Sequence, residues 1–99
     1  MLNITKNANG EELQINLEGR LDTMTAPQLE GELKTDLGGV STLIIDIEKL
    51  AYISSAGLRV LLSAQKIMNK QGSMIIRKPS EEVQEIFDVT GFSDILTIE

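Results

Sequence analysis

Apolar and polar residues alternate most regularly near the start of the chain. Within residues 11–22, apolar and polar side chains alternate from residue 13 to residue 18, and a period of two predicts a strand that buries one face. The buried positions are Leu13, Ile15 and Leu17. Residues 2–6 predict its hairpin partner, because the Asn9-Gly10 pair between the two segments is a favourable turn sequence.

A helical period follows at residues 25–37, which Gly38 and Gly39 end. Thr25 and Gln28 match a capping box, in which both side chains bond to N–H groups at the helix start. A proline in the first turn also suits a helix start, because its missing N–H has no partner there. The apolar face consists of Ala26, Leu29, Leu33 and Leu37.

The rest of the chain repeats the strand and helix pattern. Residues 41–50 contain Leu43-Ile44-Ile45, a continuous apolar run typical of a strand covered on both faces, and residues 73–78 are of the same kind. A helix then begins at Ser80 as N-cap and ends at Gly91. Its inward-facing residues are Val83, Ile86 and Phe87. Residues 94–98 predict a last short strand.

The predicted order of elements is β-β-α-β-α-β-α-β. This order indicates an α/β fold in which helices pack on a mixed central sheet of about five strands. With 41% hydrophobic residues, the 99 residues suit one compact domain that spans residues 1–99.

The helix at residues 55–71 is apolar over an arc of roughly 220°, whereas one contact surface needs about 100°. We expect it to be buried between the sheet and both neighbouring helices; the alternative is an apolar flank left open for a partner. The opposing polar sector of about 60° holds Arg59, Ser63, Lys66 and Lys70.

The composition excludes several kinds of chemistry. Histidine and cysteine are absent, which excludes the usual zinc sites and every Ser-His or Cys-His nucleophile. No phosphate loop, dinucleotide-binding turn or calcium loop occurs. We therefore expect no enzymatic activity, no cofactor and no metal. A carboxylate-based nucleotide or enzyme site around Asp22 and Asp46 is the weakest alternative.

The net charge of −6 argues against nucleic acid and anionic membranes as main partners. No apolar stretch approaches the roughly 20 residues of a membrane span, and the N-terminus lacks a signal-peptide pattern, so we expect a cytoplasmic protein. One segment is basic. Between Arg59 and Lys78 there is no acidic residue, which fits either a solvated face or a surface for an acidic partner.

The segment Tyr52 to Arg59, YISSAGLR, places two serines at the start of the apolar helix. The Ser54 side chain can cap the helix. In the first turn of the helix, Gly57 lowers helix stability by up to about 1 kcal/mol relative to alanine. Close approach of another backbone, which only glycine permits, would offset this cost. With Ala56 beside it, little side-chain bulk surrounds Ser55. A second protein's active site could reach this serine.

Three stretches now carry a resemblance to a known family. GRLDTMTAPQLE, LIIDIEKLAYISSAGLRVLLSAQK and EIFDVTGFSDILTI, in this order and spacing, resemble the STAS domain family, and within it the bacterial anti-sigma factor antagonists. The resemblance covers nearly the whole chain. The family's usual turn is Asp-Ser-Ser/Thr-Gly-Leu, and its first serine receives phosphate from an anti-sigma factor that is also a serine kinase.

The resemblance assigns roles residue by residue. Ser55 matches the phosphoacceptor, Gly57 and Leu58 match the Gly-Leu pair, and Asp22 matches an acid expected near the acceptor. Ser54 stands where the family commonly has Asp, and Ala56 replaces a hydroxyl residue. The neighbourhood of the acceptor, or its partner contact, then comprises Asp22, Thr23, Ser54, Ala56, Gly57, Leu58 and Arg59.

The function that this resemblance implies is a phospho-switch. Unphosphorylated at Ser55, the protein would bind the anti-sigma factor and free a sigma factor for RNA polymerase. The kinase would use its own ATP and magnesium, and a phosphatase would reset Ser55. The alternative is a non-phosphorylated STAS adaptor subunit of a lipid-transporting ATP-binding cassette complex.

Overall fold

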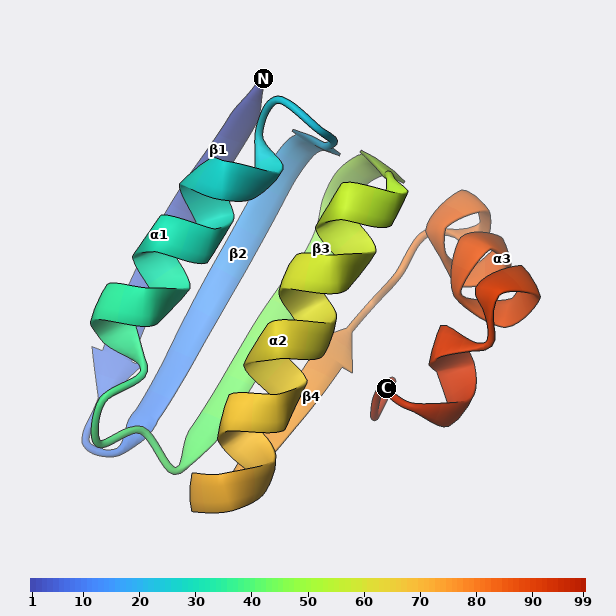
Figure 1. The fold of residues 1–99 in the computed structure, drawn as a ribbon. Helices are drawn as coiled ribbons and strands as arrows, with labels where there is room; N and C mark the ends of the chain where they lie inside the picture. The colour runs from blue at the N-terminus through green and yellow to red at the C-terminus, as the bar shows by residue number, and fades with distance from the viewer.

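The computed structural model describes all residues 1–99 and contains four strands, three α-helices and one 3-10 turn. Figure 1 shows how they are arranged. In chain order they are β1 (Leu2–Asn9), β2 (Glu12–Leu21), α1 (Ala26–Asp36), β3 (Thr42–Ile53), α2 (Ser55–Gln71), β4 (Ser73–Arg77), α3 (Glu81–Thr90) and η1 (Phe92–Asp94). No helix is long and apolar enough to cross a membrane.

The strands form one mixed sheet in the order β1-β2-β3-β4. The β1–β2 hairpin is antiparallel and turns at Gly10, whose φ is +64°, while β2, β3 and β4 run parallel to one another. The predicted hairpin and mixed sheet are therefore confirmed, and β3 occupies the interior position expected of the strand around Ile44.

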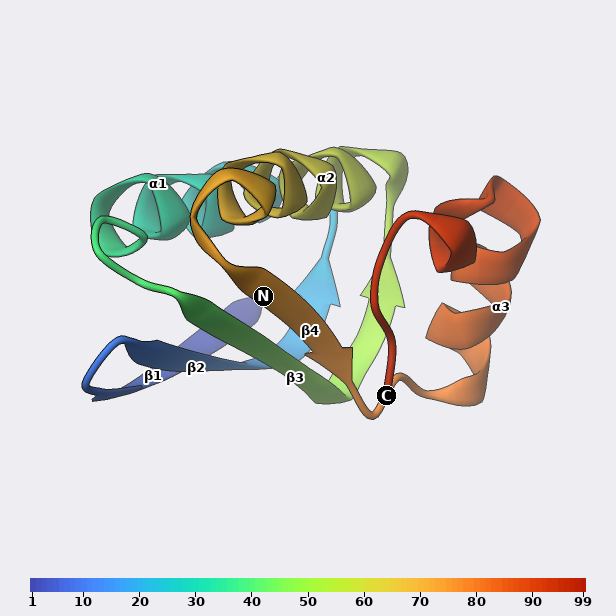
Figure 2. The same ribbon diagram turned by 90° about the horizontal axis from the view of Figure 1, so that it is seen from below.

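Helices α1 and α2 lie side by side on one face of the sheet (Figure 2). Leu13, Ile15 and Leu17 belong to the core that forms beneath them, as their alternation predicts. The expectation that the run Leu43-Ile44-Ile45 is covered on both faces is confirmed, because all three consecutive side chains are buried. Ile44 is 6% exposed and in register with Gln14 and Ile75 of the adjacent strands.

The helix ends follow the sequence at α2 and α3 but not at α1. Ser54 and Ser80 accept hydrogen bonds from N–H groups of the first turns, and Gly91 ends α3 in the left-handed conformation with φ +81°. The predicted capping box of Thr25 and Gln28 does not form, because the Thr25 hydroxyl is engaged by the turn before the helix.

Helix α2 packs on β3 and β4 and against α1, whereas α3 packs beside β3 and against η1. Figure 2 shows α3 at the edge of the sheet rather than on the face that α1 and α2 cover. The expectation of helical neighbours on both sides of α2 is therefore correct for α1 alone. Of the apolar residues on α2, Ile67 stays 37% exposed.

The predicted fifth strand at residues 94–98 is wrong. After Gly91 the chain turns through η1, which the Ser93 hydroxyl fastens to Asp88. Only Ile98 then forms a bridge, parallel to Ile76 of β4, with flanking backbone hydrogen bonds of 2.8 Å. The turn through η1 takes up the first residues of the predicted strand, so only the residues around Ile98 lie along the edge of β4.

Hydrogen exchange checks this arrangement. The amides of Leu43 to Ile45 lie in an interior strand, and we expect them to exchange only in rare, large openings. The amides of residues 7–10 lie at the tip of an edge hairpin and should exchange by local fraying. Equal protection of the two segments, measured by amide exchange with NMR, would contradict the interior position of β3.

Candidate functional site

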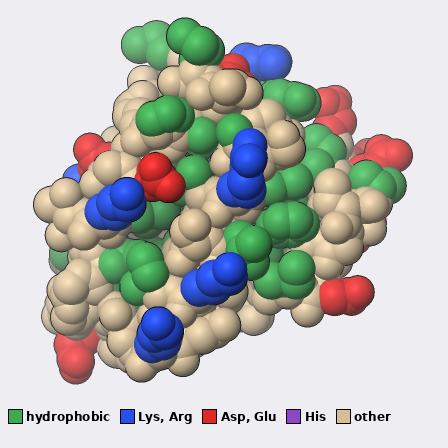
Figure 3. Space-filling view, in the orientation of Figure 1, with side chains coloured by type: hydrophobic (Ala, Val, Ile, Leu, Met, Phe, Trp, Pro, Cys, Tyr) green, Lys and Arg blue, Asp and Glu red, His purple; other side chains and the backbone are tan.

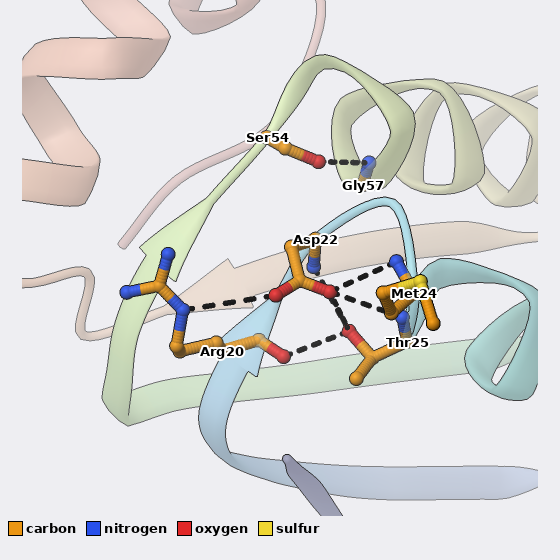
Figure 4. A network of polar contacts seen from close by, with 6 residues as sticks. All are labelled: Arg20, Asp22, Met24, Thr25, Ser54 and Gly57. Atoms are coloured by element: carbon orange, nitrogen blue, oxygen red, sulfur yellow. Dashed lines mark hydrogen bonds and ion pairs between the residues drawn. The ribbon is translucent and has the colours of Figure 1, made fainter.

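The carboxyl ends of β2 and β3 lie next to each other, and each leads into the start of a helix (Figure 4). The last register pair of these strands is Leu21 with Ile53. The Ser54 N–H then donates to the Leu21 carbonyl at 2.9 Å. This bond places the turn that contains Asp22 beside the start of α2.

The two serines at the start of α2 have different surroundings. Ser54 is half-buried, and its hydroxyl oxygen accepts from the Gly57 N–H at 3.4 Å as N-cap of the helix. Ser55 is exposed, and its hydroxyl takes part in none of the side-chain hydrogen bonds of the molecule. The fold therefore uses Ser54 and leaves the Ser55 oxygen accessible from solvent.

Asp22 organises the turn between β2 and α1. Its Oδ1 accepts from the N–H groups of Met24 at 3.0 Å and Thr25 at 3.1 Å. The Thr25 hydroxyl accepts from the Asp22 N–H at 2.9 Å and donates to the Arg20 carbonyl at 2.8 Å. Backbone and side chains thus close a compact loop below Ser54, as Figure 4 shows.

The charge of Asp22 is stabilised by this loop. Partial burial acts to raise its pKa, but the N–H groups of Thr25 and Met24, the Thr25 hydroxyl and the charge of Arg20 outweigh that effect. The pKa of Asp22 is therefore lowered from its ordinary value of 3.8. Asp22 is a fixed anion near the start of α2 at neutral pH.

A cation that the sequence did not single out completes the site. The Arg20 Nε lies 3.7 Å from Asp22 Oδ2, and the guanidinium carbon lies 4.6 Å from the centroid of the Tyr52 ring. Both contacts follow from position, since Arg20 and Asp22 are two residues apart and Arg20 is in register with Tyr52. The two-residue spacing was visible in the sequence, but the pairing with Tyr52 needed the register.

Gly57 and Leu58, which we expected either to contact a partner or to lie near the acceptor, are both buried at the start of α2. Leu58 is 4% exposed and belongs to the core. A Cβ on Gly57 would lie 2.7 Å from Cγ of Leu21 and 2.9 Å from Cγ1 of Ile53. The close neighbours of Gly57 are thus core side chains of the same chain, not the backbone of another.

The remaining residues of the expected set gather around a shallow groove between the starts of α1 and α2. Its volume is about 340 Å³. Thr23, Ala56 and Arg59 line it, with Pro27 and Glu30 on the α1 side. The groove thus begins beside Ala56, the residue that follows Ser55, and includes the exposed side chain of Arg59.

The structure does not bring Asp22 and Asp46 together. Asp46 is in register with Asn16 in the middle of the sheet and lines a hollow with Glu18 and Glu48. Asp22 lies six residues beyond Asn16, which corresponds to about 20 Å along a strand. The carboxylate-based site suggested by these two residues is therefore not formed.

Comparison with known proteins gives this arrangement a family context. A family model described as STAS domain matches residues 3–99. The anti-sigma-B factor antagonist of Bacillus subtilis is 32% identical over 98 residues, which cover 98% of this chain and 90% of that protein.

Solved structures have the same fold. An anti-sigma factor antagonist from Mycobacterium paratuberculosis superposes with a TM-score of 0.89 at 17% identity, covering 99% of this chain and 85% of that one. The Bacillus cell fate determinant SpoIIAA in its phosphorylated form gives 0.76 at 23% identity, covering 98% and 91%. At these identities the structural likeness establishes the fold alone.

We expect Gly57→Ala to destabilise the protein. The added methyl meets the buried side chains of Leu21 and Ile53, and overpacking of this kind costs about 1–3 kcal/mol. The higher helix propensity of alanine restores up to about 1 kcal/mol of stability, which leaves a net loss of stability of up to about 2 kcal/mol. Urea denaturation measures this loss as a decrease in the free energy of unfolding.

The matched control is Gly31→Ala in α1, where a Cβ meets nothing within 4 Å. This change should stabilise the protein by about 0.5–1 kcal/mol. In a Leu21→Ala background, the cost of Gly57→Ala should shrink, because the methyl then enters the space that Leu21 left. Equal effects of the two glycine substitutions would show that packing does not select Gly57.

We expect Asp22 to contribute stability that depends on pH. Because its folded-state pKa is lowered, this contribution is present above the unfolded pKa of about 4 and is lost as the pH falls through the folded pKa. The wild type should therefore exceed Asp22→Asn in unfolding free energy at pH 7. This advantage should shrink below about pH 4.

Urea unfolding of both proteins at a series of pH values measures this difference. Asp88, whose pKa is also lowered, is present in both proteins and cancels. A difference that stays constant from pH 7 to pH 3 would rule out a stabilising role for the Asp22 charge.

Proposed function

The chain belongs to the STAS domain family, and on this basis we propose that it acts as an anti-sigma factor antagonist switched by phosphorylation of Ser55. In its unphosphorylated form it binds an anti-sigma factor, which then releases a sigma factor to RNA polymerase. The relative in Bacillus subtilis supports this proposal by its name and by its identity over almost the whole chain. The place of action is the cytoplasm, where RNA polymerase works.

The observation that carries the proposal is the contrast between the two serines. Ser54 is occupied as the N-cap of α2, whereas the Ser55 hydroxyl is exposed and unbonded beside a groove of small side chains. A kinase active site needs an accessible hydroxyl with room around it. Ser55 meets this requirement and Ser54 does not.

The reaction itself belongs to the partner. The Ser55 oxygen attacks the γ-phosphorus of ATP held by the kinase with magnesium, the bond to ADP breaks, and the hydroxyl proton passes to a base of the kinase. A phosphatase reverses the modification by hydrolysis. This chain supplies the acceptor and its fixed surroundings.

The phosphate acts on the interface and not on the fold. Phosphoserine carries about −1.5 to −2 charges, which the N-terminus of α2 accommodates because the helix dipole and free N–H groups favour anions there. Docking would place the same charge in a closely packed contact with the partner, where it loses water. Phosphorylation therefore releases the partner without unfolding the domain.

A second candidate is the adaptor subunit of a lipid-transporting ATP-binding cassette complex. Ser54 favours it, because the resemblance places an aspartate before the acceptor serine and this chain has none there. In that function the same surface would be a permanent contact, and Ser55 would stay unmodified.

Substitutions at Ser55 separate switching from folding. Ser55→Ala should change the unfolding free energy by less than about 0.5 kcal/mol, since its hydroxyl makes no hydrogen bond, and should bind the anti-sigma factor without accepting phosphate. Ser55→Asp should be as stable or more stable, yet bind at least about tenfold more weakly. Pull-down from the source cell with wild-type and Ser55→Asp baits identifies the partner, and calorimetry with the purified partner measures affinity.

Ser54→Ala is the matched control on the neighbouring residue. It should lose about 1 kcal/mol of stability with the N-cap, yet still be phosphorylated by the purified partner and ATP. Mass spectrometry that places the phosphate on Ser54 would overturn the assignment of Ser55. No phosphate on either serine, with a kinase that binds, would favour the adaptor.

A further inference from the structure

The outward face of α2 carries a line of basic side chains. Arg59, Lys66 and Lys70, here called the basic strip, are all exposed, and Ser63 lies among them. Their spacing places them on one side of the helix over a length of about 16 Å. Figure 3 shows Lys and Arg side chains in a row over α2, on the face opposite to the sheet.

No acidic residue of the protein neutralises the basic strip. All three ion pairs of the molecule involve Lys6 or Arg20, although the chain has 15 acidic residues and a net charge of −6. Lys66 and Lys70 are four residues apart, where like charges disfavour a helix. The fold therefore keeps a local concentration of positive charge that it does not itself use.

A groove lined by both apolar and polar side chains runs beside the basic strip. The groove between the starts of α1 and α2 continues along the two helices, because Glu30, Val60 and Ser63 line both its wide part and its narrower extension. The extension has a volume of about 80 Å³ and ends at Ile67, which is 37% exposed. Its other walls are Leu33, Lys34 and Ala64.

We propose that the basic strip and this groove together bind an acidic amphipathic helix of the anti-sigma factor. This inference rests on the proposed function and names the chemistry of the partner. Carboxylates of the partner helix lie against Arg59, Lys66 and Lys70, and its small apolar side chains enter the groove toward Ile67. On the α1 wall, Glu30 lines both parts of the groove and repels carboxylates, whereas Lys34 lines the extension and attracts them.

Charge favours a protein helix over the other anionic partners. A membrane or a nucleic acid presents negative charge over a wide area and would also meet the acidic residues of the neighbouring elements. Helix α1 by itself carries three acidic residues, Glu30, Glu32 and Asp36, and the net charge of the whole molecule is −6. A single helix is narrow enough to follow the basic strip and the groove, where Glu30 is the one of these three acids that it meets.

The test compares two double variants with the same charge. Lys66→Gln/Lys70→Gln removes two charges from the basic strip, and Lys49→Gln/Lys78→Gln removes two exposed charges from outside α2. Stopped-flow binding to the purified anti-sigma factor, at low and high salt, measures association rates. We expect the first variant to associate about tenfold more slowly at low salt, with the difference shrinking at high salt. The second variant should associate within about twofold of wild type.

A second measurement does not depend on the anti-sigma factor. A synthetic amphipathic helix with glutamates on one side and leucines on the other is titrated into labelled protein, beside the same peptide with lysines for glutamates. NMR shifts should map to α2 from Arg59 to Lys70 with the acidic peptide only, and should be lost in Lys66→Gln/Lys70→Gln.

The outcomes distinguish the two proposals. If wild type binds the anti-sigma factor and both double variants associate at the same rate as it does, the basic strip has no role and the proposed function stands. If no anti-sigma factor binds, the proposed function fails, and the peptide titration still decides the chemistry of the strip. Binding to phosphatidylglycerol vesicles, absent with phosphatidylcholine and lost in Lys66→Gln/Lys70→Gln, would overturn the inference in favour of a membrane surface.

Discussion

The parallel pairing of β2 with β3 determines where every functional group lies. Parallel strands end at the same edge of a sheet, and here both continue into helices on the same face. The bond from the Ser54 N–H to the Leu21 carbonyl closes this edge, and Gly57 allows Leu21 and Ile53 to fill the space beneath. A side chain at Gly57 would push α2 away from the sheet. The exposed position of Ser55 thus depends on a buried contact below it.

The residues around Ser55 fall into two sets, one that holds the local backbone in place and one that is exposed to solvent. Asp22 Oδ1 and the Thr25 hydroxyl hold one turn through hydrogen bonds, and Ser54 is committed to the helix start. Their fixed geometry lowers the entropy that docking would otherwise lose. Ser55 and the groove residues take no part in these hydrogen bonds. Because the neighbouring side chains are held in place, Ser55 and the groove residues stay accessible to a partner.

The sequence predicted the features that depend on local pattern. Alternation around Ile15 identified β2, and the Ser80 and Gly91 signals gave both ends of α3 correctly. The failures concern competition between alternative hydrogen-bond partners and contacts between separate elements. Thr25 is a residue type that favours the N-cap position, but its hydroxyl forms its hydrogen bonds within the turn at Asp22 instead. The stacking of Arg20 on Tyr52 was not predicted, because the register between β2 and β3 is irregular. The neighbours of Gly57 were not predicted either, because they come from two other elements. The last two facts join residues of separate elements, so no local stretch of the sequence contains them.

The proposed phospho-switch and the proposed role of the basic strip would be coupled by their spacing on one helix. Ser55 and Arg59 are four residues apart, so a phosphate on Ser55 lies within reach of the Arg59 guanidinium on the same face of α2. Arginine and phosphate form strong charge-assisted hydrogen bonds, and Arg59 has no ion pair within the protein to give up. Phosphorylation would then withdraw one of the three cations of the strip while adding negative charge at its end. The same modification that obstructs the packed contact would thereby lower the attraction that brings an acidic partner to it, and both effects act in the direction of release.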